Sequence, residues 1–255
     1  TCTDKFGKVI KTPPNKAICD VNKTITFTED YKRIKENIDS LFADTDATDI
    51  ADKLFTYVKD SIGGFNPDQI RYCIDIIKDY ANKNDDCKQS IINALTLLND
   101  RRFNTGTIKR SSLQHVLKIA LDDIFDTSPM IMEITNSRFS RINMASREQL
   151  RAPKNNEKIL IIDAEAFEPE GELCDAVMIV KAFKLGWERF IVYKYRGQRF
   201  TGCGFGPSTK NVRIDVYGAS GDYLASGIDG MEIQVHGNAQ DQLCQIMKDG
   251  KLIVF

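Results

Sequence analysis

The first half of the chain spaces its hydrophobic residues as amphipathic helices do. Between residues 28 and 126, apolar side chains recur three and four positions apart in five successive stretches, a period that places them on one face of an α-helix. Residues that end or begin helices, such as Gly63-Gly64 and Asn66-Pro67, separate the stretches. We therefore predict five helices with short connections, arranged as an N-terminal α-helical bundle rather than as a repeat scaffold.

The pattern changes in the second half of the chain. Lys158 to Asp163 is a short apolar run typical of a buried strand, residues 173–186 have helical spacing, and residues 189–195 again have the pattern of a strand. A strand, a helix and a strand in this order predict two parallel neighbouring strands. Arg196-Gly197 then predicts a turn that returns the chain through residues 198–200 as a hairpin.

The C-terminal part repeats itself. Val212 to Gly218 is echoed nineteen residues later by Met231 to Gly237, and Lys251 to Phe255 begins a third copy. Each copy alternates apolar and polar residues, a repeat typical of a stacked β-solenoid. The glycines expected to form its sharp turns are Gly218, Gly221, Gly227, Gly230, Gly237 and Gly250.

Together the patterns predict an α+β chain of several regions: an N-terminal α-helical bundle, a small α/β unit and the start of a right-handed β-solenoid. The predicted boundaries are 1–127 for the helical domain, 128–157 for a polar linker, 158–207 for the α/β unit with its hairpin, and 208–255 for the first solenoid coils. Because an open coil exposes unpaired backbone groups, we expect further coils, in a chain that continues or was cleaved, or a protein partner to cover the C-terminal edge.

The composition is that of an ordinary globular protein and favours a cytoplasmic location. The 255 residues are 42% hydrophobic and 28% charged with a net charge of −1, so charge selects neither nucleic acid nor an anionic membrane as partner. No apolar run approaches the ~18–20 residues of a membrane-spanning helix, and no signal-peptide pattern opens the sequence. The seven cysteines are odd in number and form no CxxC pair, which indicates reduced thiols and favours the cytoplasm.

Candidate chemistry is sparse. Asp163, Glu165 and Glu170 follow a predicted strand and have the carboxylates that a divalent cation or acid–base catalysis needs, but a solvated loop explains them as well. The alternating glycines of residues 202–206 lack the spacing and the following helix of a nucleotide-binding turn. Cys2 is disfavoured as an amidotransferase nucleophile because Thr1 precedes it.

The remaining candidate residues lie in the second half of the chain: Arg199, Cys203, His236 and Asp241. His236 occupies the position that Tyr217 has in the previous copy, so stacking of like positions accounts for it without chemistry. Neither histidine lies one helical turn from another histidine or beside a cysteine pair. We expect no metal and no cofactor in this chain.

Three segments carry a resemblance to a known family: Arg196 to Phe200, Gly218 to Gly230 and His236 to Gln242. They are similar to the glycine-repeat (GXGXG) β-helix domain at the C-terminus of the glutamate synthase large subunit and of glutamate synthase-related proteins. The resemblance covers residues 158–255. It implies a non-catalytic scaffold or assembly domain of a glutamate synthase-like protein or complex, with amidotransferase or flavin subunits as partners.

Two other classes of function stay open. The chain could be a glutamate synthase-related oxidoreductase or amidotransferase, with its site between the solenoid and the α/β unit. It could also be a ligand-sensing module that uses the helical array. The absence of cluster-spaced cysteines and of a phosphate-binding loop favours a chain that is not an enzyme by itself.

Overall fold

The computed structural model describes residues 29–43 and 49–255. Its first half contains the predicted helices: α1 (Glu29–Ala43), α2 (Ile50–Ser61), α3 (Pro67–Tyr80), α4 (Asp85–Asp100) and α5 (Arg110–Asp126), with a 3-10 turn, η1 (Ile62–Gly64), after α2. Within the described ranges, no helix is both long enough and apolar enough to cross a membrane.

Local sequence explains where these helices start. The side chain of Asn66 accepts a hydrogen bond from the backbone of Gln69, whose side chain accepts one from the Asn66 backbone in return, and Pro67 occupies the first helical position of α3. Such a capping box satisfies backbone groups that have no partner inside the helix. Asn84 caps α4 in a similar way, by accepting a 2.8 Å hydrogen bond from the backbone of Cys87.

The second half forms one open sheet in which all neighbouring strands are parallel. The strands are β1 (Phe139–Asn143), β2 (Ile159–Asp163), β3 (Arg189–Arg196), β4 (Arg213–Ala219), β5 (Asp229–Val235) and β6 (Asp249–Val254). They lie side by side in sequence order. A 3-10 turn, η2 (Met144–Gln149), follows β1, and α6 (Asp175–Lys184) connects β2 to β3.

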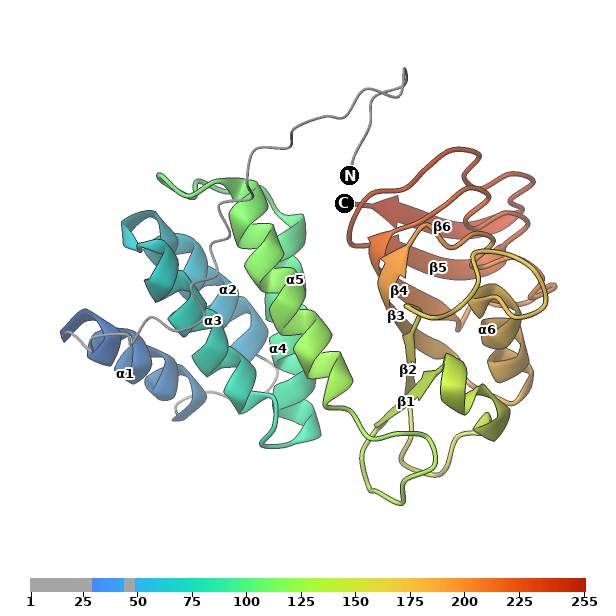
Figure 1. The fold of residues 1–255 in the computed structure, drawn as a ribbon, viewed down its shortest axis with the longest axis horizontal. Helices are drawn as coiled ribbons and strands as arrows, with labels where there is room; N and C mark the ends of the chain where they lie inside the picture. The colour runs from blue at the N-terminus through green and yellow to red at the C-terminus, as the bar shows by residue number, and fades with distance from the viewer. Residues whose placement is uncertain (1–28, 44–48) are drawn as a thin grey trace, which may run out of the picture.

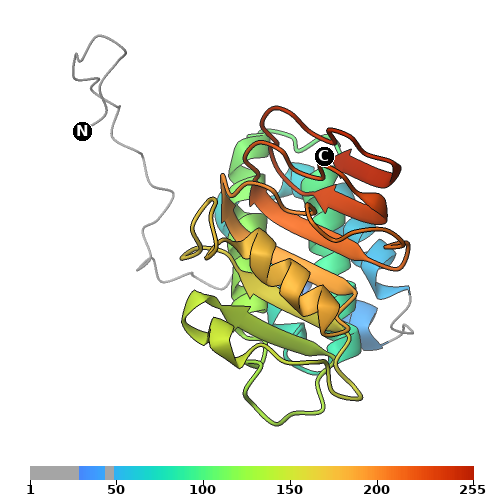
Figure 2. The ribbon, with the colours of Figure 1, turned by 90° about the vertical axis from the view of Figure 1, so that its right-hand side faces the viewer.

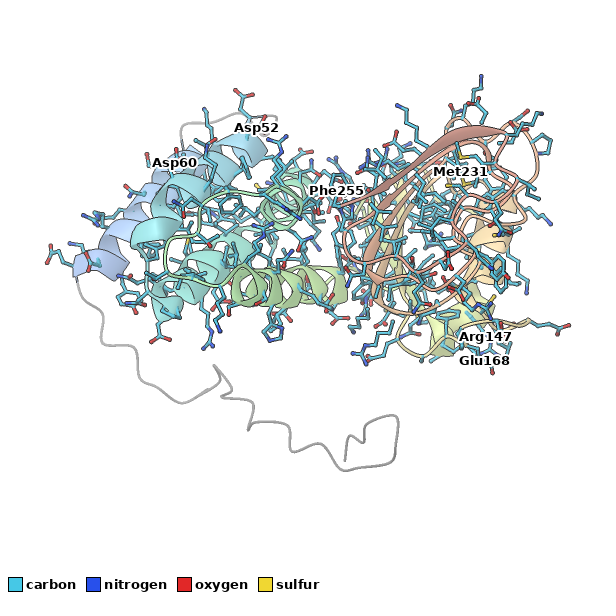
Figure 3. The ribbon with its side chains drawn as sticks, turned by 90° about the horizontal axis from the view of Figure 1, so that it is seen from above. Asp52, Asp60, Arg147, Glu168, Met231 and Phe255 are labelled. Carbon is cyan, nitrogen blue, oxygen red and sulfur yellow. The ribbon has the colours of Figure 1, made fainter. Side chains whose placement is uncertain are left out.

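The sheet lies between two layers (Figure 1). Helices α1 to α5 lie on one side of it, with α4 and α5 nearest the strands, and α6 covers part of the other side (Figure 2). One hydrophobic cluster joins the N-terminal helices to sheet residues that include Phe139, Ile161 and Tyr217. A second cluster joins the opposite sheet face to α6. Phe255 lies at the junction of the helices and the sheet (Figure 3).

The predicted fold class is wrong, because the chain forms an α/β arrangement and not a β-solenoid. The three repeated segments are strands, and positions nineteen residues apart do pair: Ile214 with Ile233, and Ile233 with Leu252. However, they continue the single open sheet that β1 to β3 begin. The segments that return the chain between them are mostly turns, so they add no further sheet faces as the coils of a solenoid would.

The α/β unit is confirmed in part. Strands β2 and β3 are parallel and α6 connects them. The predicted hairpin is wrong, because residues 198–200 form no strand and β4 pairs with β3 in parallel. Strand β1 was not predicted at all. Its polar Ser140 and Arg141 hid a strand within the segment that we expected to be a linker.

Close packing of neighbouring strand ends explains two of the predicted turn glycines. A Cβ on Gly218, whose φ is +132°, would lie 2.3 Å from the carbonyl oxygen of Tyr195. A Cβ on Gly237 would lie 2.3 Å from the carbonyl oxygen of Gly218. Backbones that approach this closely exclude any side chain, so these glycines allow the carboxyl ends of β3, β4 and β5 to lie side by side.

Candidate functional site

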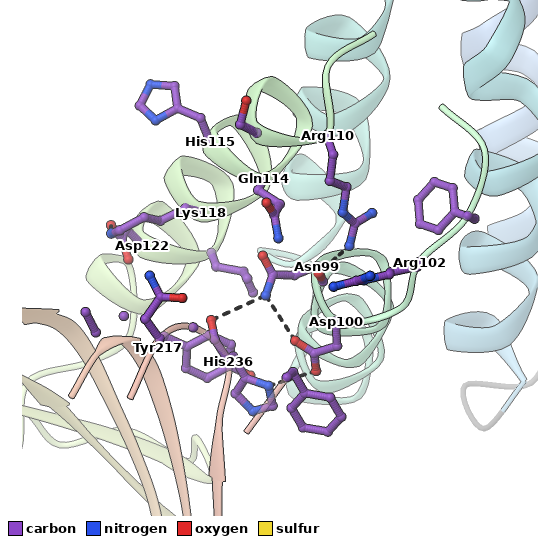
Figure 4. A pocket seen from close by; sticks show the side chains of 18 residues that line it. Asn99, Asp100, Arg102, Arg110, Gln114, His115, Lys118, Asp122, Tyr217 and His236 are labelled. Carbon is purple, nitrogen blue, oxygen red and sulfur yellow. Dashed lines mark hydrogen bonds and ion pairs between the residues drawn. The ribbon is translucent and has the colours of Figure 1, made fainter. Parts of the chain in front are cut away.

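A cleft of about 770 Å³ lies between the helices and the sheet. Its walls are the end of α4, the first three turns of α5, and the residues at the carboxyl ends of β4 and β5 (Figure 4). In open α/β sheets, ligands bind outside the carboxyl ends of the strands at points where the strand order reverses; this sheet keeps the sequence order throughout, so the assignment depends on the volume and the lining of the cleft. The volume is within the range of small-molecule sites, so the cleft is the candidate functional site.

Helix α5 presents a polar stripe to the cleft. Arg110, Gln114, Lys118 and Asp122 all line it, and residues four positions apart lie on one face of a helix. Lys118 and Asp122 form an ion pair with each other. Burial raises the pKa of Asp122 and the contact with Lys118 opposes this shift. The pair therefore adds no net charge to the cleft at neutral pH.

Two arginines, Arg102 and Arg110, lie near the N-terminus of α5 (Figure 4). Arg110 donates a hydrogen bond to the carbonyl oxygen of Asn99 and lies over the ring of Phe103, 5.0 Å from its centroid. Its Nη1 atom is buried and has no hydrogen-bond partner among the described residues. Burial lowers the pKa of Arg110, the carboxylate of Asp100 opposes this shift, and the charge of Arg102 adds a smaller decrease. The two guanidinium groups are thus close enough to repel each other.

His236 closes the floor of the cleft. It follows β5 directly, and its side chain is only 2% exposed. Its Nδ1 lies 2.8 Å from Oδ2 of Asp100, the last residue of α4, and its Nε2 lies 3.3 Å from Oδ1 of Asp215 in β4. The ring stacks on Tyr217, at a centroid distance of 4.5 Å, and on Phe255, at 5.4 Å. The stacking predicted from the repeat is confirmed for Tyr217.

The two carboxylates set the charge of this histidine. Burial alone would lower the pKa of His236, but the hydrogen bonds to Asp100 and Asp215 outweigh it, so the pKa is raised above its ordinary value. Burial of Asp215 would raise its pKa, but His236 and Arg213 together lower it. The two carboxylates therefore favour the imidazolium form of His236, and the two cationic neighbours favour the ionised form of Asp215.

The acidic candidates after β2 form a separate cluster. Oδ2 of Asp163 lies 2.9 Å from Nζ of Lys194, and Glu165 lies 3.1 Å from Arg196. Asp126, at the end of α5, accepts hydrogen bonds from the same lysine at 3.1 Å and from the hydroxyl of Tyr193. Lys194 has a φ of +54° at an irregularity between β3 and β4. These contacts join the helical layer to the sheet and line none of the cleft.

The other candidate residues also lie away from the cleft. Arg199 pairs with Glu170, and its guanidinium lies over the ring of Tyr223, 5.3 Å from the centroid. The thiol of Cys203 lies 3.3 Å from the carbonyl oxygen of Tyr223, and burial raises its pKa. Asp241 accepts a 2.7 Å hydrogen bond from the backbone of the next residue, as turn aspartates do. Cys2 lies outside the described residues.

Sequence reasoning missed most of the cleft. Asp100, Arg102 and Arg110 lie at the end of one helix and the start of the next, and Asp100 is 136 residues from the histidine it contacts. The clustering of Arg101, Arg102 and Arg110 around a helix connection was visible in the sequence. It would have indicated a basic site at this end of the helices.

Among residues 29–43 and 49–255, no group of three or more His, Cys, Asp or Glu side chains is placed to hold a metal ion. Comparison of the chain with protein-family models, with curated proteins and with solved structures finds no match. The function must therefore be argued from the geometry of the cleft.

Proposed function

We propose that the protein is a binding protein for a small anionic ligand, one that carries a phosphate or carboxylate group, and that the ligand occupies the cleft between α4, α5 and the ends of β4 and β5. The observation that carries this proposal is the pair of neighbouring guanidinium groups of Arg102 and Arg110. An anion between two guanidinium groups offsets their mutual repulsion, and guanidinium groups match carboxylate and phosphate oxygens with paired hydrogen bonds.

The unpaired charge of the cleft is positive. The carboxylate of Asp100 is paired with His236, and that of Asp122 with Lys118. Arg102 lines the cleft and has no ion pair among the described residues, and one buried nitrogen of Arg110 has no hydrogen-bond partner there, although the carboxylate of Asp100 attracts its charge. A buried donor that lacks a partner costs about 1–3 kcal/mol. An anion placed between the arginines would offset that cost.

The start of α5 supports the same ligand chemistry. This helix has 17 residues, and Lys109 at its N-cap makes no side-chain capping hydrogen bond. The first backbone N–H groups of a helix have no partner within it, and the helix dipole favours negative charge there. Arg110 and Ser111, in the first turn, both line the cleft. These backbone donors add to the arginines and lie at the same end of the cleft.

The test is isothermal titration calorimetry with two probes, sodium pyrophosphate and citrate, at constant ionic strength. We expect wild-type protein to bind at least one probe, and Arg102→Gln and Arg110→Gln to bind it at least tenfold more weakly. Arg101→Gln is the matched control, because Arg101 lies over the ring of Phe55, 5.1 Å from its centroid, and does not line the cleft. No heat of binding with either probe, or equal losses in all three variants, would contradict the proposal.

An assembly role in a glutamate synthase-like complex, as the sequence resemblance implies, is a second proposal. The observation that favours it is β6, which has no neighbouring strand on its outer side among the described residues and exposes the apolar side chains of Ile253 and Val254. Open strand edges pair readily with other chains. Co-purification from source cells tests it: amidotransferase or flavin subunits in a fixed ratio would support the role, and their absence would oppose it.

A further inference from the structure

We propose that His236 is the positioning residue of the anion-binding cleft: its protonated ring holds the end of α4, and with it the two arginines, against the sheet, so that anion affinity falls when the ring loses its proton. This inference concerns the regulation of the site proposed above and rests on that function. His236 touches no ligand itself, because its side chain is 2% exposed and both faces of its ring are stacked.

The geometry requires two donors on the ring. One nitrogen faces Asp100, at 2.8 Å, and the other faces Asp215, at 3.3 Å. An imidazolium donates from both nitrogens, whereas a neutral imidazole has one N–H and one bare lone pair. A neutral ring would therefore place a lone pair against one of two buried carboxylates. Since Asp100 ends α4 and Asp215 belongs to β4, the protonated ring adds an ionic link between helix and strand to the hydrophobic cluster that also joins them.

A second contact at the end of α4 positions Arg110. Nδ2 of Asn99 donates a 3.3 Å hydrogen bond to the carbonyl oxygen of His236, and the carbonyl oxygen of Asn99 accepts the hydrogen bond from Arg110. Arg102 follows Asp100 by two residues in the sequence. When the end of α4 moves away from β5, both guanidinium groups lose the arrangement that brings them to one anion.

Loss of the proton also changes the charge that the ligand meets. Asp215 would keep Arg213, whose Nη2 lies 2.8 Å from its Oδ1 and which also contacts Glu232 at 3.5 Å. Asp100 would keep only its neutral contact with Asn99 and the attraction of Arg110 from α5. Its uncompensated carboxylate would then compete with an anionic ligand for Arg110. The uncharged Tyr217 and Phe255 on either side of the ring offer no replacement.

The direction of the pH dependence follows from these groups. The pKa of His236 is raised by its two carboxylate partners against the effect of burial. The ionic contacts of His236 with Asp100 and Asp215 are therefore complete at low pH. They are lost as the pH rises through the folded-state pKa of His236, which lies above the ordinary value of about 6.5. Anion binding should be strongest at acidic and neutral pH and weaken under alkaline conditions.

The experiment measures sulfate affinity by calorimetry between pH 5.5 and 9, because sulfate keeps its charge over this range. We expect wild-type affinity to fall at least fivefold in step with the titration of His236, followed by NMR. The His236→Phe variant should bind sulfate weakly, with an affinity that does not change with pH. It should keep the ring stack, because aromatic residues, Tyr217 and Phe255, occupy the corresponding positions of the neighbouring repeats. Thr96→Val is the control: it removes the 2.8 Å contact between α4 and Tyr217 but no charge, so it should keep the wild-type profile.

A second readout does not depend on the ligand. Amide hydrogen exchange at residues 99–103, corrected for the intrinsic effect of pH, should accelerate in wild-type protein as His236 titrates. A flat sulfate profile in wild-type protein, or faster exchange that does not follow His236, would overturn the positioning role. If sulfate, pyrophosphate and citrate all fail to bind while the exchange still follows His236, the positioning stands and the proposed anion-binding function fails.

Discussion

Two buried carboxylates lie on opposite faces of the same sheet and differ in their partners. Asp215 faces the N-terminal helices and contacts two cationic side chains, those of Arg213 and His236. Asp175, the first residue of α6, lies on the other face and accepts a 2.9 Å hydrogen bond from the hydroxyl of Thr201. Asp215 is 8% exposed and Asp175 is 0% exposed, so burial does not separate them.

The partners decide the charge of each group. The pKa of Asp215 is lowered by its cationic neighbours despite burial, whereas burial raises the pKa of Asp175 to about 6 because a hydroxyl only partly opposes it. Oδ1 of Asp175 has no hydrogen-bond partner in the described part of the chain. The carboxylate on the helical face therefore has cationic partners beside an open cleft, whereas the carboxyl group on the α6 face is enclosed and has none.

The largest effect on stability is expected when Asp215, the carboxylate between Arg213 and His236, is removed. Asp215→Ala removes the carboxylate that Arg213 and the buried His236 share and leaves each with one acidic partner, Glu232 and Asp100, so the free energy of unfolding should fall by about 3 kcal/mol. Urea denaturation at pH 7 measures it. Glu232→Gln is the control, since Glu232 is 31% exposed in its contact with Arg213 and should cost at most about 1 kcal/mol. Equal decreases in the free energy of unfolding in the two variants would show that the contacts of Asp215 with Arg213 and His236 do not stabilise the fold.

The next largest effect is expected at Gly218, where the backbones of β4 and β3 approach each other closely. Gly218 follows Tyr217, which stacks on His236, and its α-carbon approaches Tyr195, whose hydroxyl contacts Thr201. Gly218→Ala should destabilise the fold by about 2–3 kcal/mol, because its Cβ would meet backbone at a positive φ.

Gly227→Ala gives the matched comparison for this glycine. Gly227 also has a positive φ, of +73°, but its Cβ would meet nothing nearer than 3.9 Å. Strain alone should then cost about 1 kcal/mol. Thermal unfolding of both variants checks the difference, and a Gly227 variant as unstable as the Gly218 variant would show that close approach is not the cause.

Asp175→Asn sharpens the comparison by its pH dependence. The pKa of Asp175 is raised in the folded state, to about 6, so its carboxyl group stabilises the fold below about pH 4 and this contribution is lost as the pH rises to about 6. The amide cannot ionise. The variant should therefore be more stable than wild type by about 3 kcal/mol at pH 7 and equal to it near pH 4. Unfolding free energies at the two pH values decide it; a constant difference would mean that Asp175 does not titrate as described.

The smallest effect on stability is expected in the cleft itself. Arg102→Gln removes one of two mutually repelling charges and breaks no ion pair of the described residues, so the unfolding free energy without ligand should change by less than about 0.5 kcal/mol. Anion affinity should nevertheless fall at least tenfold. A loss of stability as large as that of Asp215→Ala would show that Arg102 is a structural residue.

The sequence predicted elements better than their assembly. Helical spacing correctly predicted α1 to α5. The apolar run before Asp163 and the helical spacing after it correctly predicted a parallel strand and its crossover helix. The solenoid was wrong because a repeated strand with a glycine specifies parallel neighbours in register and not the shape of the segment that returns the chain. For the same reason Arg196-Gly197 predicted a hairpin where the chain continues to a parallel strand.

The candidate site was predictable only at one residue. His236 was identified from its place in the repeat, but its partners Asp100 and Asp215 come from an α-helix and another strand. Local spacing holds no information on contacts between residues more than a hundred positions apart. Asp215 is simply the polar residue in an alternating strand, and burial next to a histidine became visible only in three dimensions.

The most direct test of the central claim is an NMR titration of the ¹⁵N-labelled protein with sodium sulfate at pH 6.5. We expect saturable chemical-shift changes in the amides of residues 99–103, 110–114 and 236–238, which line or adjoin the cleft, and their loss in Arg102→Gln. Changes spread over the whole surface without saturation, or saturable changes that persist in Arg102→Gln, would contradict it.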